Sequence, residues 1–144
     1  TASGVGRPVT WLCRAAREVV VVTTPEMPAF SDAYGLIKLL QQHGVTRPPH
    51  LVVNHADSPE EAEEASHRLR LVARRFLQLE LDAWGSVPYD PSVPRAVRSQ
   101  EPVLTTFPQA PASLAIQALA RSLWDVPPPT PRIESDSEPQ RLEA

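Results

Sequence analysis

The chain has 144 residues, a size at which a domain buries about two thirds of the surface that its unfolded form exposes. With 42% hydrophobic and 22% charged residues it has a globular composition, which excludes a wholly disordered chain and a fibrous repeat. The net charge of −3 comes from residues 125–144, which carry five acids and two arginines and leave 12 acidic and 12 basic residues on positions 1–124. A neutral body argues against direct nucleic acid binding.

The content of cysteine and of apolar runs limits the cellular setting. Cys13 is the only cysteine, so no internal disulfide forms, and no set of cysteines and histidines makes a metal site. The longest apolar run, Val19–Val22, is far too short to cross a bilayer. We therefore expect a cytoplasmic chain with no membrane segment and no metal.

The first half of the chain predicts a helix, a strand, a second helix and a second strand. Apolar residues in PVTWLCRAAR (8–17) recur at helical spacing, with a proline where its missing N–H does no harm. The β-branched run EVVVVTT (18–24) does not alternate, which is typical of a strand buried on both faces of a parallel sheet. Ser31 is expected to cap the next helix, which stops at Gly44. A second buried strand is predicted over 50–54.

The second half begins with the clearest helix-start signal in the sequence. Ser58 can cap the helix, Pro59 fits its first position, and Glu61 can reach back to the chain before it. Apolar residues at three- and four-residue spacing then predict a stripe that faces the sheet. The residues of this stripe are Ala62, Ala65, Leu69, Val72 and Phe76.

A third strand over 83–88 and helices at about 92–99 and 111–124 complete the body of the chain. Strands that alternate with helices imply right-handed βαβ crossovers, so the fold class is α/β, a parallel sheet with helices on both faces. Ligands of such sheets bind outside the carboxyl ends of the strands. The candidate site therefore comprises Thr23-Thr24-Pro25-Glu26, Asn54-His55 and Pro88-Tyr89-Asp90.

The sequence contains no complete motif for phosphate binding, metal binding or nucleophilic catalysis. The five glycines form no phosphate loop, and the only lysine, Lys38, lies inside a predicted helix. No serine stands in a Gly-x-Ser-x-Gly turn. Cys13 is interpreted as a small core residue and not as a nucleophile. Three tryptophans are expected to pack in the core: Trp11, Trp84 and Trp124. We therefore assign no catalytic and no metal-ligating residue.

Asn54 is the polar side chain whose position suggests binding. It directly follows a buried apolar strand, where an amide can read the edge of a base or hydrogen-bond its own loop. Spacing alone favours the loop role.

Several short motifs, taken in order, together resemble a known family. Thr1-Ala2-Ser3-Gly4 is similar to the end of an Asp-Thr-x-x-Gly switch segment, after which come a helix and the strand VVVVTTPE. Further matching segments are SDAYGLIKLL (31–40), FL (76–77), GSVPYD (85–90), AV (96–97) and FP (107–108). Together they resemble the MinD/ParA family of P-loop ATPases, and within it the flagellar-number regulators of the FlhG (FleN) type. The resemblance covers about residues 1–123 and implies the C-terminal half of that fold.

The resemblance implies a ligand and a role for each matching residue. ATP and Mg²⁺ are the cofactors of the intact family protein. Gly4 is expected to approach the γ-phosphate through its backbone amide, and Asn54 to hydrogen-bond adenine, which now favours the base role over the loop role. The loop that is expected to close over the base consists of Pro88, Tyr89 and Asp90.

The family also implies partners and a location. Its members form homodimers around ATP, and the flagellar regulators act with an FlhF-type GTPase and with flagellar switch or transcription-control proteins. Such a protein is cytoplasmic and reaches the membrane or the cell pole through its partners.

Two departures from the family pattern set the expected domains. The lysine-containing P-loop, its Mg²⁺-binding hydroxyl and the aspartate before Thr1 are absent, so residues 1–124 are expected to form a partial nucleotide-binding domain that does not hydrolyse ATP alone. Residues 125–144 are expected to form a disordered acidic, proline-rich tail, in which Ile133 and Leu142 lie among acids and do not make a membrane-surface helix.

The expected function is therefore the C-terminal part of an ATPase that regulates flagellar number and placement through ATP-dependent dimerisation. The alternative is a non-catalytic protein-interaction module derived from that fold. A third candidate is an α/β enzyme or receiver-like domain that shares only the layer architecture. A narrow sheet with an exposed edge is also expected to be prone to instability or aggregation.

Overall fold

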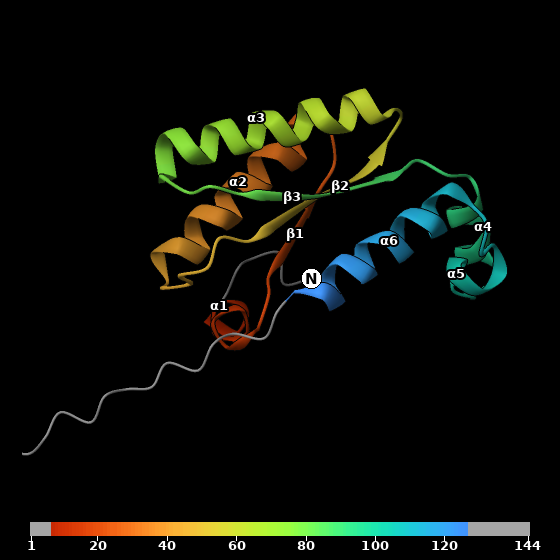
Figure 1. Ribbon diagram of the computed structural model, residues 1–144, viewed down its shortest axis with the longest axis horizontal. Helices are drawn as coiled ribbons and strands as arrows, with labels where there is room; N and C mark the ends of the chain where they lie inside the picture. Colours follow the sequence, from red (N-terminus) through yellow and green to blue (C-terminus); the bar gives the residue numbers. More distant parts are fainter. Residues whose placement is uncertain (1–6, 127–144) are drawn as a thin grey trace, which may run out of the picture.

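The computed structural model describes residues 7–126, which form a three-stranded sheet with six helices around it (Figure 1). The elements in chain order are α1 (Arg7–Ala15), β1 (Val20–Thr23), α2 (Met27–Gln42), β2 (His50–Ala56), α3 (Pro59–Leu77), β3 (Asp82–Pro88), α4 (Ser92–Arg98), α5 (Val103–Thr106) and α6 (Pro111–Asp125). The strand order is β1-β2-β3 and both pairings are parallel. The predicted α/β class, with a parallel sheet and βαβ connections, is confirmed.

The register brings the carboxyl ends of the three strands to one edge of the sheet. Val22 of β1 lies opposite Val52 of β2, and Asn54 of β2 lies opposite Val87 of β3. Paired residues of parallel strands point to the same side, so Val22, Val52 and Asn54 share one face.

One side of the sheet, which we call the covered face, packs against α2 and α3. Val21 and Leu51 point into this side, where they join Ile37 of α2 and Leu69 of α3 in one buried cluster. Leu69 is 0% exposed and Ile37 is 1% exposed. This layer is a complete core, built where two amphipathic helices return over the strands that they connect.

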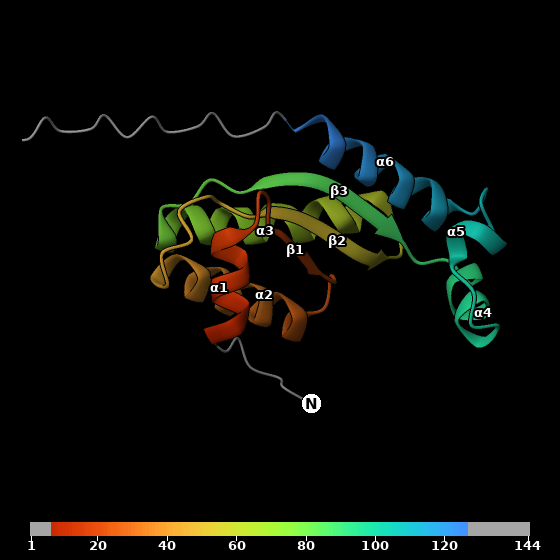
Figure 2. The same cartoon turned by 90° about the horizontal axis from the view of Figure 1, so that it is seen from below.

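The opposite side, which we call the open face, is covered only in part. Helix α6 packs there against β3, and Val52, Val87 and Ala112 form its buried cluster. Figures 1 and 2 show the strands between α2 and α3 on one side and α6 on the other. In β1, Val20 is 37% exposed and Val22 is 58% exposed. The expectation that this strand is buried on both faces is therefore wrong, because no described helix covers the open face of β1.

The start of α2 also differs from expectation. The helix begins at Met27, four residues before Ser31, with Pro28 in its first turn. The Ser31 hydroxyl lies inside the helix and donates to the Met27 carbonyl at 3.1 Å, so it does not cap the amino end. The predicted stop is confirmed, since Gly44 follows the helix with a φ of 78°, a conformation that favours glycine.

The stripe predicted for α3 is half right. Ala62, Ala65 and Leu69 are buried as expected, but Phe76 is 65% exposed, with the Arg75 guanidinium 5.5 Å from its ring centroid. The buried row continues by steps of four residues through Ala73 and Leu77. Phe76 lies one residue before Leu77, about 100° around the helix, and turns away from the sheet, whereas Val72 is half-buried.

Two of the three tryptophans do not pack in the core. Trp11 is 68% exposed on α1 and Trp124 is 88% exposed at the end of α6, whereas Trp84 packs against the open-face cluster. The helix α6 ends at Asp125. The predicted acidic tail lies outside the described residues, apart from its first two positions.

Candidate functional site: the carboxyl edge of the sheet

The three segments predicted from sequence do end at the same edge. Thr23, the last residue of β1, lies opposite Val53 of β2, and the Tyr89 amide donates to the Ala56 carbonyl at 2.9 Å. The loop after β3 is thereby tied to the end of β2. Gly4, the remaining predicted ligand residue, lies outside the described residues.

A bulge interrupts β2 at this edge. The register with β3 shifts between Asn54 and Ala56, and the residue between them, His55, has a φ of 63°. The His55 ring meets the Tyr89 ring edge-on, with centroids 4.8 Å apart. Non-glycine residues at positive φ cost free energy and concentrate at functional sites, and bulges re-aim side chains beside them. The local backbone therefore marks this edge independently of any motif.

The Asn54 side chain is available to a ligand. It is exposed, and within residues 7–126 it makes no hydrogen bond. The loop role, in which the amide satisfies its own turn, is thus not what the structure shows. Asn54 borders one hollow of about 290 Å³ beside Thr24 and Asp32, and another of about 390 Å³ beside Val87. Neither of these two hollows includes Tyr89.

Asp90 serves the backbone of the site. Its two carboxylate oxygens accept hydrogen bonds from the Ser92 amide at 2.8 Å and from the Ala112 amide at 3.1 Å, and the residue is 5% exposed. These two amides, that of Ala112 foremost, hold the pKa of the Asp90 carboxyl below its ordinary value. Asp90 therefore joins the first turns of α4 and α6, while Tyr89, half exposed, is the aromatic group of the loop.

Acidic side chains of the chain itself lie at the helix starts of this edge. The Glu61 amide donates to the Ser58 hydroxyl at 3.1 Å, and the Glu61 carboxylate accepts from the Asp57 amide at 2.7 Å, which confirms the predicted cap. At the start of α2, the Glu26 carboxylate accepts from the Thr24 hydroxyl at 2.8 Å. Carboxylates in these places repel phosphate, so the described part of the edge suits a neutral base better than a triphosphate.

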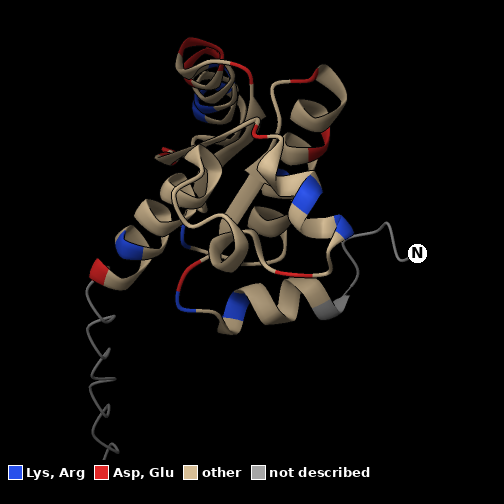
Figure 3. Ribbon diagram, turned by 90° about the vertical axis from the view of Figure 1, so that its right-hand side faces the viewer, with Lys and Arg blue, Asp and Glu red and all other residues tan. Residues whose placement is uncertain are grey.

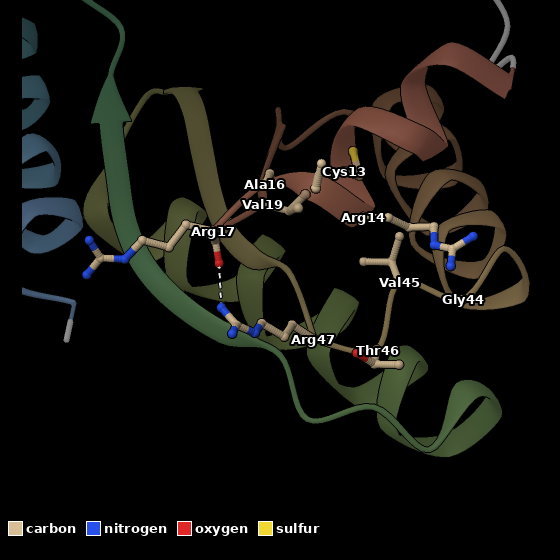
Figure 4. A pocket seen from close by; sticks show the side chains of 10 residues that line it. Cys13, Arg14, Ala16, Arg17, Val19, Gly44, Val45, Thr46 and Arg47 are labelled. Carbon is tan, nitrogen blue, oxygen red and sulfur yellow. Dashed lines mark hydrogen bonds between the residues drawn. The ribbon is translucent and has the colours of Figure 1, made fainter. Parts of the chain in front are cut away.

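Another hollow, of about 560 Å³, lies at the opposite end of the sheet between α1 and the α2–β2 loop (Figure 4). Three arginines line it, but Arg14 and Arg17 point away from each other. Arg47 donates to the Arg17 carbonyl at 2.7 Å and lies 3.7 Å from the Glu18 carboxylate. Because the guanidinium groups diverge and one is paired, they make no anion cradle.

Charge and metal chemistry add no further site within the described residues. Basic and acidic segments are interspersed in Figure 3, with no continuous basic stripe in that view. No cluster of three metal-ligating side chains occurs between residues 7 and 126. Over the same residues, none of the helices combines the length and the apolar character that a bilayer span requires.

Comparison with curated proteins reveals clear relatives. The chain is 42% identical over 130 residues to the antiactivator FleN of Pseudomonas aeruginosa. It is 33% identical over 116 residues to the septum site-determining protein MinD of Bacillus subtilis. An uncharacterized ATP-binding protein of Methanocaldococcus jannaschii is 29% identical over 121 residues. These alignments cover 88%, 75% and 84% of this chain, respectively.

The fold agrees with these relatives. A MinD cell division protein of Aquifex aeolicus superimposes with a TM-score of 0.64 at 22% identity, over 90% of this chain and 52% of that protein. The chain spans only 46% of FleN and 39% of the Bacillus MinD. No protein-family model matches it. Sequence similarity to three curated proteins, together with the shared fold, shows that this chain is homologous to FleN and to MinD-like proteins and matches about half of their length.

Proposed function

We propose that this chain supplies the base-contacting part of an ATP-binding regulator of the FleN type, which controls flagellar number and placement through ATP-dependent dimerisation. The observation that carries the proposal is the 42% identity to FleN over 88% of the chain. One of the other relatives is named an ATP-binding protein and another a septum site-determining protein, which supports nucleotide-dependent control of where a structure is built.

The geometry supports a role in holding the base. The Asn54 amide carries both donors and an acceptor, which match the edge of adenine, and no described residue uses them. Pro88 ends β3 and Tyr89 follows it at the same edge, and Asp90 fixes the loop by accepting hydrogen bonds from the first turns of α4 and α6. Phosphate and Mg²⁺ contacts then come from the rest of the intact protein, together with the Gly4 amide of this chain.

The proposed protein works as a dimer in the cytoplasm. Hydrolysis needs the phosphate loop, its lysine and Mg²⁺, which this chain alone does not supply. The partners proposed for it are a second copy, an FlhF-type GTPase and flagellar switch or transcription regulators.

A chimera tests this function directly. The segment of Pseudomonas aeruginosa FleN that matches this chain is replaced by the chain, and the chimera is expressed in a strain that lacks FleN. We expect restored flagellar number and Mg²⁺-dependent ATP binding by calorimetry. A folded chimera that binds no ATP favours the non-catalytic interaction module. One that binds ATP but leaves flagellar number uncorrected refutes the flagellar role alone.

Asn54→Ala in the chimera is the residue-level test. We expect ATP affinity to fall by about 1–3 kcal/mol, the usual effect of leaving a buried hydrogen-bonding partner unpaired. Gln42→Ala is the matched control, because Gln42 is an exposed amide at the far end of α2. Equal ATP affinity of the Asn54 variant and the control would remove Asn54 from the base site.

A further inference from the structure

The pairing between β2 and β3 changes register twice, and the first change lies near the start of the two strands. Leu51 lies opposite Ala83, whereas Val52 lies opposite Gly85. One extra residue, Trp84, is therefore accommodated in β3. The pairs that follow it are displaced by one position along β3.

The second change lies at the candidate site and has the opposite sense. Asn54 lies opposite Val87 and Ala56 lies opposite Pro88, so the extra residue, His55, is now in β2. It cancels the first displacement, because one added residue in each strand restores the original pairing. The displaced stretch thus ends at the left-handed backbone of His55, whose φ is 63°.

The displaced register decides which side chain lies beside Asn54. If the register of Leu51 with Ala83 continued unchanged, Ser86 would lie opposite Asn54. Paired residues of parallel strands share a face, and a serine hydroxyl both donates and accepts, so it would offer the amide a partner. Val87 lies there instead and has no polar side-chain atom. The Asn54 amide is accordingly exposed and makes no hydrogen bond within residues 7–126.

The extra residue in β2 also decides where the chain goes next. By strict alternation Ala56 would share the open face with Asn54. The bulge turns Ala56 to the covered face, where it is 2% exposed and packs with Ala62 of α3. Its carbonyl accepts from the Tyr89 amide at 2.9 Å, and the His55 ring contacts the Tyr89 ring. The same bulge therefore ends the open face of β2 at Asn54 and ties the following loop beside it.

We propose that His55 is a positioning residue for the base contact. Its left-handed backbone keeps β2 and β3 in the displaced register, which leaves the Asn54 amide free for adenine and holds Tyr89 next to it. The identity of the ligand rests on the proposed function, whereas the positioning is a property of this chain alone.

The conformational preferences of amino acids make the backbone role separable from the ring. Asparagine and glycine adopt a positive φ readily, whereas a β-branched residue at positive φ is a strong outlier. His55→Asn therefore removes the ring and retains the backbone conformation. His55→Val opposes that conformation and favours a regular strand.

Hydrogen exchange in the full 144-residue chain tests the positioning. The readout is the exchange rate of the Tyr89 amide, which bonds Ala56, relative to that of the Leu69 amide in the buried row of α3. We expect His55→Val to raise this ratio about tenfold or more, and His55→Asn to change it by less than about threefold. Nuclear magnetic resonance of the isotope-labelled chain measures it. The side-chain amide signals of Asn54, read in the same spectra, should move in His55→Val.

Gln78→Val is the matched control. Gln78 also has a positive φ, 56°, but it follows α3 just before β3 begins, at the opposite end of the sheet. The same kind of strain there should lower the melting temperature as His55→Val does. The ratio of Tyr89 to Leu69 exchange should stay at its wild-type value.

ATP affinity of the FleN chimera carries the test to the ligand. We expect His55→Val to weaken ATP binding about tenfold or more, and His55→Asn and Gln78→Val to keep it within about threefold. A purely structural role of His55 predicts that His55→Val and Gln78→Val weaken ATP binding equally, because both strain a left-handed residue. Calorimetry distinguishes these results.

The outcomes that overturn the inference are specific. If His55→Asn raises Tyr89 exchange as much as His55→Val, the ring and not the backbone places the loop, and the inference is wrong. It is equally wrong if His55→Val leaves the exchange ratio, or the ATP affinity of a chimera that binds ATP, at the wild-type value. Should His55→Val not fold, His55→Ala compared with His55→Asn decides the same question, since alanine also resists a positive φ. A chimera that binds no ATP, with the expected exchange pattern in the chain, supports the positioning and counts only against the proposed function.

Discussion

The covered face and the open face are two sides of one sheet with different degrees of completion. On the covered face Leu51 and Leu69 are 1% and 0% exposed. On the open face, Val20 and Val22 of β1 are 37% and 58% exposed. Residues of β1 alternate between exposed on the open face and buried on the covered face. The burial that stabilises the described residues therefore lies chiefly on the covered face. The other side presents apolar surface that the described residues leave partly uncovered.

The largest effect is expected on the covered face. Leu69→Ala should lower the free energy of unfolding by about 2–5 kcal/mol, because it removes a fully buried side chain between α3 and the sheet and leaves a cavity. Leu71→Ala, two residues away and 56% exposed, is the control and should change it by no more than about 0.5 kcal/mol. Urea denaturation followed by circular dichroism measures both. Similar losses for the two variants would mean that α3 is not anchored by this row.

On the open face a buried carboxylate adds to the apolar cluster between α6 and β3. Asp90 holds the start of α6 through the Ala112 amide and the start of α4 through the Ser92 amide. Its pKa is lowered in the folded state, so its contribution to stability is present above the unfolded pKa of about 3.9. The contribution is lost as the pH falls through the folded pKa. Asp90→Asn should therefore lower the melting temperature at pH 7 and make it less sensitive to acid.

Thermal melts between pH 2 and pH 7 measure this difference. Asp32→Asn provides the control, because Asp32 is an exposed carboxylate on α2 for which no hydrogen bond is described. The melting curves of wild type and Asp90→Asn should converge at the acid end. If they stay parallel down to pH 2, the carboxylate charge does not hold α6 to the sheet.

Sequence patterns were enough to predict the three strands, their parallel pairing and each described helix except α5 (Val103–Thr106), which they missed. The capping residues around Ser58, the stop at Gly44 and the β-branched strands are local signals, and a short-range pattern determines each of them. The pattern could not reveal which face of β1 is covered, since a run of valines reads the same whether one helix layer or two lie against it. That depends on how much of the fold the chain contains.

For the candidate site, too, the sequence predicted some features and could not predict others. The position of Asn54 after a buried strand predicted its place at the carboxyl edge, and the structure adds that its amide is unpaired within residues 7–126. No sequence pattern predicted the bulge at His55, although histidine tolerates a positive φ better than most residues. The use of Asp90 as a shared cap for two helices joins Ser92 to Ala112, a separation that local spacing cannot encode.

The smallest effect is expected at Phe76, where sequence reasoning favoured a core position. Phe76→Ala should change the free energy of unfolding by about 0.5 kcal/mol or less, because the ring is 65% exposed and contacts the Arg75 guanidinium. Its neighbour provides the contrast: Leu77 is 8% exposed within the covered-face cluster, and Leu77→Ala should cost about 2–5 kcal/mol. Urea titration of the two variants decides between adjacent residues about 100° apart on the helix. If Phe76→Ala proves the costlier change, α3 is rotated, and the division into covered and open faces fails with it.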